Sequence, residues 1–168
     1  MANKPKTCRI KLQGTPIESL KLSSSELQIV TIARYYFETF AHPEKQSWQD
    51  AIAISVKKFG NNAGPVVALS VLSFLQNIRI ARSSTFQFNN PKCPACSKFL
   101  TDHERTFFNI IRSILNGDNT SAAAFATILC ETNDIKKVLR SVSALTHNYK
   151  EISTYSSNLS AINRKPKV

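Results

Sequence analysis

Helix-start signals constrain the fold of this 168-residue chain more than any other sequence feature. Ser23-x-x-Glu26 and Thr101-x-x-Glu104 both match the capping box, in which two side chains accept hydrogen bonds from each other's backbone amides at a helix N-terminus. Apolar residues three and four positions apart follow each box, which is the spacing of an amphipathic helix. The two boxes therefore predict helices that begin near Ser23 and Thr101.

The same reasoning predicts four further helices. They span residues 47–59, 65–82, 121–132 and 133 onward, separated by turns rich in Gly, Asn and Asp. Residues 83–92 break the helical period and hold at most one short extended piece. The predicted fold is all-α with about six helices. An N-terminal three-helix unit is joined by a Cys-x-x-Cys turn to a C-terminal helical hairpin and a last helix.

Composition and turn-forming residues divide the chain into four segments. Residues 1–22 form a basic N-terminal segment, and 23–88 form the N-terminal helical unit. Residues 89–155 hold the Cys-x-x-Cys turn and the C-terminal helical unit, and 156–168 form a basic tail that we expect to be flexible. A chain of this length forms one domain, or two small units that share a core.

Positive charge is concentrated at the two ends of the chain. Residues 1–21 carry five Lys or Arg against one Glu, and residues 136–168 carry seven against one, within a net charge of +11. Basic ends favour polyanionic partners, nucleic acid before an anionic membrane surface. In the last predicted helix several cations lie opposite the apolar stripe, although an ordinary solvated helix face has the same pattern. The candidate nucleic-acid-binding residues are Lys136, Lys137, Arg140, Lys150, Arg164, Lys165 and Lys167.

Cys93-Pro94-Ala95-Cys96 suggests a metal site. Zinc prefers four tetrahedral ligands, and a Cys-x-x-Cys turn supplies two of them. If the helices on either side of Gly117 run antiparallel, Cys130 climbs back by about 15 Å, to a level near residue 106. His103 lies less than one turn from that level. Cys93, Cys96, His103 and Cys130 are therefore predicted to form a Cys₃His zinc site of structural type.

Other interpretations of these residues stay open. Cys130 could be a small buried core residue, and His103 an ordinary residue in a first helical turn. Cys8 could replace either of these two ligands, and the same set could hold an iron–sulfur cluster. A redox-active Cys-x-x-Cys is less favoured, because the chain lacks the strands of a thioredoxin-like fold and because Asp102 and Glu104 would oppose a nearby thiolate.

No catalytic signature accompanies the cysteines, so we do not expect an enzyme. The chain shows no secretory signal and no apolar stretch of about 20 residues, which predicts a cytoplasmic protein without a membrane segment. The favoured hypothesis is a small regulatory protein that binds nucleic acid, DNA before RNA, through its basic ends and carries structural zinc. The alternatives are a protein-interaction adaptor without nucleic-acid binding and a thiol or metal redox sensor.

Overall fold

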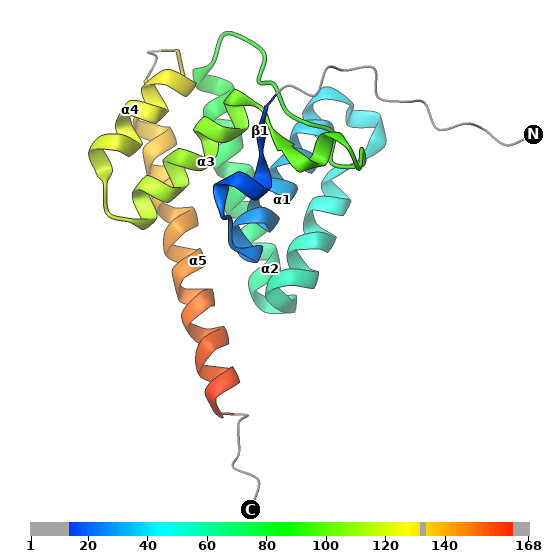
Figure 1. Cartoon of the computed structure of the whole chain (residues 1–168), viewed down its shortest axis with the longest axis vertical. Coiled ribbons are helices and arrows are strands. Elements are labelled where there is room, and N and C mark those ends of the chain that lie inside the picture. The colour runs from blue at the N-terminus through cyan, green and yellow to red at the C-terminus, as the bar shows by residue number, and fades with distance from the viewer. Residues whose placement is uncertain (1–13, 132–133, 163–168) are drawn as a thin grey trace, which may run out of the picture.

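A computed structural model describes residues 14–131 and 134–162, with side chains described as far as Lys150. Its helical architecture confirms the all-α prediction (Figure 1). The helices are α1 (Ser24–Ala41), α2 (Trp48–Ala81), α3 (Asp102–Leu115), α4 (Asn119–Leu129) and α5 (Lys136–Ile162). Short 3₁₀ turns span Ile17–Leu20, Pro43–Lys45 and Cys96–Lys98. A two-stranded antiparallel ladder joins β1 (Thr15–Pro16) to β2 (Phe99–Leu100), with Thr15 opposite Leu100.

Both capping boxes are present. The Ser23 hydroxyl accepts a hydrogen bond from the Glu26 amide at 3.2 Å, and the Glu26 carboxylate accepts one from the Ser23 amide at 2.7 Å. The equivalent distances at Thr101 and Glu104 are 3.1 and 2.8 Å. The starts of α1 and α3 therefore lie where the local sequence predicts them.

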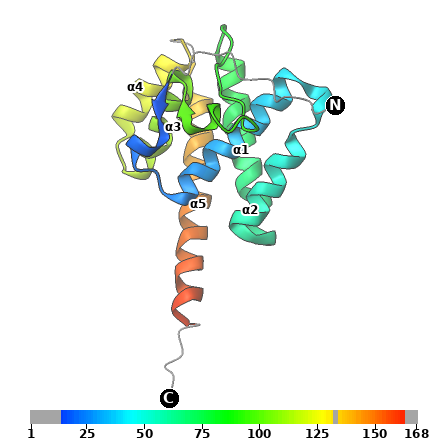
Figure 2. The same ribbon diagram turned by 45° about the vertical axis from the view of Figure 1, so that its right-hand side comes forward.

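The described residues form five helices rather than about six, because the second and third predicted helices belong to the single element α2. At Gly60 the backbone has φ 83° and ψ 169°, a conformation open essentially to glycine alone, and the helix is kinked there. The two halves of α2 then run side by side (Figures 1 and 2). A Cβ atom on Gly64 would lie 2.5 Å from Val56 Cα, and the Ser55 hydroxyl donates to the Gly64 carbonyl at 2.7 Å. Two glycines thus make a fold-back possible: one supplies the kink and the other the close approach.

One hydrophobic core unites the helices. It takes Ile29 and Ile32 from α1, Phe74 from α2, Phe107 from α3 and Val142 from α5, all at most 2% exposed. The rings of Phe74 and Phe107 stack with their centroids 4.9 Å apart. α2 packs against α1 and α5, and the α3–α4 hairpin packs against α5, so the predicted N-terminal and C-terminal units share this core.

The last helix is longer than its sequence suggests. Its backbone continues to Ile162, beyond residue 156, where the tail was expected to begin, and its second half projects from the body of the molecule (Figure 2). Among the described helices, α2 has the length and apolar composition to cross a membrane. The central helix of a soluble bundle meets the same criterion, so this property does not distinguish the two situations.

Candidate nucleic-acid interface and cysteine turn

The first half of α5 separates a buried face from a charged one. Val138, Val142 and Leu145 are fully buried. Lys136 and Arg140, one turn apart on the opposite side, are exposed, as is the neighbouring Lys137. His147 and Lys150 continue this exposed face toward the projecting half of the helix. We refer to Lys136, Lys137, Arg140, His147 and Lys150 as the α5 basic face. It extends for about 21 Å along the helix axis.

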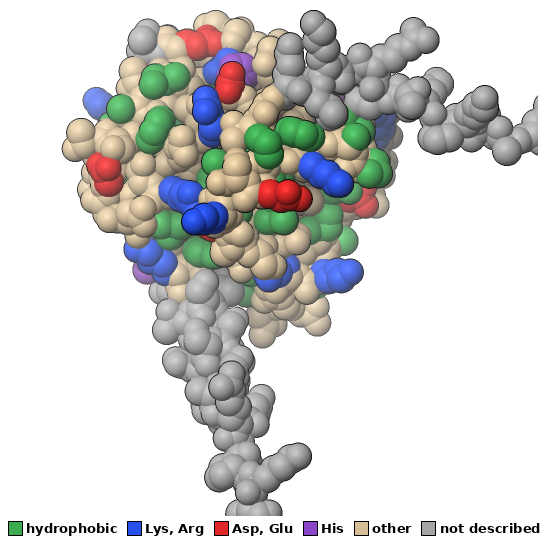
Figure 3. Space-filling view, in the orientation of Figure 1, with side chains coloured by type: hydrophobic (Ala, Val, Ile, Leu, Met, Phe, Trp, Pro, Cys, Tyr) green, Lys and Arg blue, Asp and Glu red, His purple; other side chains and the backbone are tan. Residues whose placement is uncertain are grey.

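Six of the eleven other cations whose side chains are described are matched by carboxylates. Ion pairs join Arg34 to Glu104, Lys45 to Glu38, Arg82 to Glu131, Lys92 to Asp50, Arg105 to Asp102 and Arg112 to Glu26. On the face seen in Figure 3, cationic side chains are scattered over the body and some have an acidic side chain beside them. By contrast, no described carboxylate forms an ion pair with Lys136, Lys137 or Arg140. The body therefore neutralises part of its own charge, whereas the start of α5 presents three adjacent cations with no counter-charge among the described side chains.

Three of the predicted nucleic-acid-binding residues, Arg164, Lys165 and Lys167, lie outside the described residues, as does most of the basic N-terminal segment. Of that segment's cations, Lys21 is described and exposed. The structure thus places four of the seven candidates on one exposed helical face: Lys136, Lys137, Arg140 and Lys150.

The Cys-x-x-Cys sequence forms a compact turn before α3. The two sulfur atoms of Cys93 and Cys96 lie 2.7 Å apart, and the Cys96 amide donates to the Cys93 sulfur at 3.2 Å. Cys96 is buried and Cys93 is partly exposed. Next to the turn, Lys92 pairs with Asp50 at 3.0 Å and lies over the ring of Tyr35, so the turn lies beside α1 and the start of α2.

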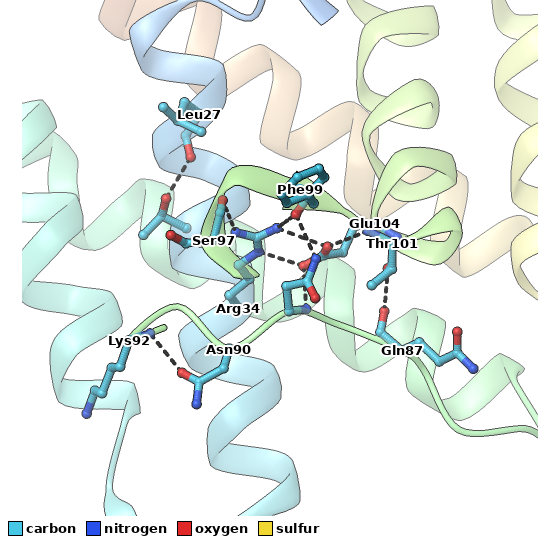
Figure 4. Close-up of polar contacts among 11 residues, drawn as sticks. Leu27, Arg34, Gln87, Asn90, Lys92, Ser97, Phe99, Thr101 and Glu104 are labelled. Atoms are coloured by element: carbon cyan, nitrogen blue, oxygen red, sulfur yellow. Dashed lines mark hydrogen bonds and ion pairs between the residues drawn. The ribbon is translucent and has the colours of Figure 1, made fainter. Parts of the chain in front are cut away.

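A buried ion pair fixes the segment that carries this turn (Figure 4). Arg34 and Glu104, whose side chains are 3% and 4% exposed, form a two-pronged contact at 2.6 and 3.0 Å. Arg34 also donates to the carbonyls of Ser97, at 2.9 Å, and Phe99. Glu104 also accepts from the amides of Asn89, at 3.1 Å, and Thr101. Glu104, the acidic residue of the α3 capping box, therefore also anchors both ends of the turn, at one end through Arg34 of α1.

The other two predicted zinc ligands lie elsewhere, close to Arg82. The Nδ1 atom of His103 accepts a hydrogen bond from the Gln87 amide at 2.9 Å, and its Nε2 lies 3.5 Å from the Arg82 guanidinium. Burial and the charge of Arg82 both lower the pKa of His103. Cys130 is fully buried at the end of α4, and burial raises the pKa of its thiol to about 11. The Nδ1 lone pair of His103 already accepts a hydrogen bond and its Nε2 lies beside a cation, so neither nitrogen is placed to bind zinc, which takes a free imidazole lone pair.

Among the described residues, no three His, Cys, Asp or Glu side chains form a group that could hold a metal ion. Cys93 and Cys96 are brought together, and His103 and Cys130 both lie near Arg82, but the four do not form one site. The helical rise correctly predicted at which end of the α3–α4 hairpin Cys130 lies. It could not show that the cysteine turn lies to one side, against α1. Cys8 lies outside the described residues.

Arg34 and Arg82 organise their surroundings, although neither lies in a sequence motif that predicts this role. Arg82 pairs with Glu131 at 3.1 Å and donates to the Leu129 carbonyl. Glu131, in a left-handed conformation with φ 57°, accepts from the Ser83 amide at 2.9 Å. The one sequence signal for Arg34 is its position inside the apolar stripe of α1, between Ala33 and Tyr36.

Comparisons of the chain with protein-family models, with curated proteins and with solved structures found no match.

Proposed function

We propose that this protein binds nucleic acid through the α5 basic face. The observation that carries the proposal is that Lys136, Lys137 and Arg140 are exposed on one helix and pair with no described carboxylate, although six other cations of the body each do. Phosphate groups are the partners that such cations meet on nucleic acids, and their contacts give sequence-independent affinity.

Salt dependence measures how many cations contact phosphates. Each phosphate contact contributes about −0.9 to the slope of log K against log salt on duplex DNA, and about −0.7 on a single strand. Replacing Lys136, Lys137 and Arg140 together by Gln is therefore expected to reduce the slope by roughly 2.7 on a duplex and roughly 2.1 on a single strand. Fluorescence anisotropy with labelled 30-mers of duplex DNA, single-stranded DNA and RNA, titrated at several salt concentrations, gives the slopes and the preferred nucleic acid.

A matched control separates the α5 basic face from net charge. The triple variant Lys45→Gln, Lys92→Gln and Arg105→Gln removes the same charge from exposed cations that already pair with carboxylates. We expect it to bind nearly as the native protein does. Equal losses in the two triple variants would show that net charge alone drives binding, and would contradict the proposal. Affinity that does not change with salt in the native protein would contradict it as well.

The C-terminal cations can be tested in the same way. A variant with Arg164→Gln, Lys165→Gln and Lys167→Gln is predicted to reduce the slope further if the tail follows the same strand. An unchanged slope would restrict the phosphate contacts to the helix.

A further inference from the structure

A pocket of about 290 Å³ lies where α1 and α2 end. Phe37 and Phe40 of α1, Ile78 and Arg79 of α2, and Phe86 and Phe88 of the connecting segment line it. Its volume is close to the lower end of the range for small-molecule sites, which begins at about 300 Å³. It therefore suits a ligand of one or two rings.

Stacked rings form an aromatic wall of the pocket. The Phe37 ring stacks on Phe86 with centroids 4.0 Å apart and an interplanar angle of 15°, and on Phe88 at 5.5 Å and 23°. Phe37 is buried, whereas Phe40, Phe86 and Phe88 are partly exposed. Rings held in this way provide flat apolar surface at little cost in side-chain freedom, which favours a flat aromatic ligand.

Arg79 supplies the charge at this pocket. Its guanidinium lies over the ring of Phe40, 5.2 Å from the centroid; it is exposed and forms no ion pair with any described carboxylate. Arg82, the other cation of the lining, is already paired with Glu131 and hydrogen-bonded to Ser84 at 2.6 Å. The pocket thus has one uncompensated positive charge. A single charge suits a monoanion, and a guanidinium fork matches a carboxylate in two-pronged geometry.

We propose that this pocket binds a small aromatic carboxylate, with the ring against the phenylalanines and the carboxylate on Arg79. The exposed side chains of Ser83 and Thr85 at the pocket lining offer hydroxyl donors for the same group. The site is independent of the α5 basic face, so either proposal can fail without the other.

The experiment compares 1-naphthoate with its neutral amide, 1-naphthamide, as probes for the full-length protein. Calorimetry is expected to show naphthoate binding at least 10-fold more tightly, and amide NMR shifts are expected to cluster in residues 37–41 and 78–88. Arg79→Gln, an exposed change that spares the core, is expected to weaken naphthoate by roughly 10- to 100-fold, the range for a lost charged hydrogen bond. The same variant should leave naphthamide affinity within about twofold, because the amide has no charge for Arg79 to neutralise.

Arg105→Gln is the matched control, since Arg105 is also exposed but pairs with Asp102 on α3. It should change neither affinity. Phe40→Leu keeps apolar volume but removes one ring, and should weaken both probes equally. The proposal is overturned if naphthoate shifts no amide in the two segments, or if it binds no better than naphthamide. It is also overturned if Arg79→Gln weakens the two probes equally.

Discussion

Replacing Glu104 by Gln should lower the free energy of unfolding by about 3–5 kcal/mol, the cost of removing one partner of a buried ion pair. The carboxylate accepts four hydrogen bonds, two from Arg34 and one each from the amides of Asn89 and Thr101. A glutamine keeps one oxygen and turns its NH₂ group toward the donors on the other side. Two donors then lose their acceptor, at about 1–3 kcal/mol each, and the buried guanidinium loses its counter-charge.

Urea denaturation followed by circular dichroism at 222 nm measures this cost. With a slope of about 2 kcal/mol per molar, typical of a domain of this size, the midpoint should fall by roughly 1.5–2.5 M. Hydrogen exchange should accelerate most at one of two amides, Asn89 or Thr101, because they donate to different carboxylate oxygens and the NH₂ group replaces only one of these.

Asp102→Asn provides the control, because it breaks an exposed ion pair with Arg105 in the same first turn of α3. Exposed pairs contribute about 0–1 kcal/mol, so its midpoint should shift by less than about 0.5 M. If Glu104→Gln shifts the midpoint no more than Asp102→Asn, the Arg34–Glu104 pair does not organise the cysteine turn and the reasoning is refuted.

Three further results are expected. Gly64→Ala should lower stability by about 3 kcal/mol, the upper end of overpacking costs, because its Cβ would meet Val56 Cα at 2.5 Å; scanning calorimetry should show a melting temperature lower by roughly 6–12 °C, and an unchanged value would contradict the close approach. Burial lowers the pKa of His103, so the unfolded state takes up the proton more readily. The contribution of His103 to stability is therefore full above a pH of about 6.5 and is lost as the pH falls further. The free energy of unfolding should fall less between pH 7 and 5 in His103→Asn than in the native protein, and an equal or larger fall would be the contrary result. Elemental analysis of protein purified without chelator tests the zinc prediction: because the four predicted ligands do not form one site among the described residues, we expect less than one zinc per native chain, and one zinc per chain that is lost in Cys93→Ser/Cys96→Ser would be the contrary result.

Local signals predicted the helices well. A capping box involves residues three positions apart, so the starts of α1 and α3 could be read directly at Ser23 and Thr101. The fold-back of α2 was predicted as a turn between two helices, since glycine and proline mark a break without giving its geometry. Residues 61–64 are instead helical, and Gly60 alone carries the kink.

The sequence patterns did not predict which distant segments lie side by side. A helical rise gives the height of Cys130 on the α3–α4 hairpin but not the direction in which residues 83–100 leave α2. Arg34 pairs with a residue 70 positions away, and its sequence neighbours do not distinguish a buried arginine from a surface one. The Arg79 pocket was missed for the same reason, because its aromatic rings come from two separate segments and its arginine from a third.

The fold-back of α2 has a consequence for how fast the chain can fold. Ser55 and Gly64 are nine residues apart, and closing a loop of about ten residues takes on the order of 10–100 ns. Contacts this close in sequence cost little chain entropy, so the α2 hairpin can form in the transition state, whereas the Arg34–Glu104 pair must wait for a loop of 70 residues to close. Stopped-flow chevrons should therefore show Gly64→Ala slowing folding and Glu104→Gln mainly speeding unfolding. The second half of the molecule would then assemble on a helical hairpin that its two glycines had already shaped.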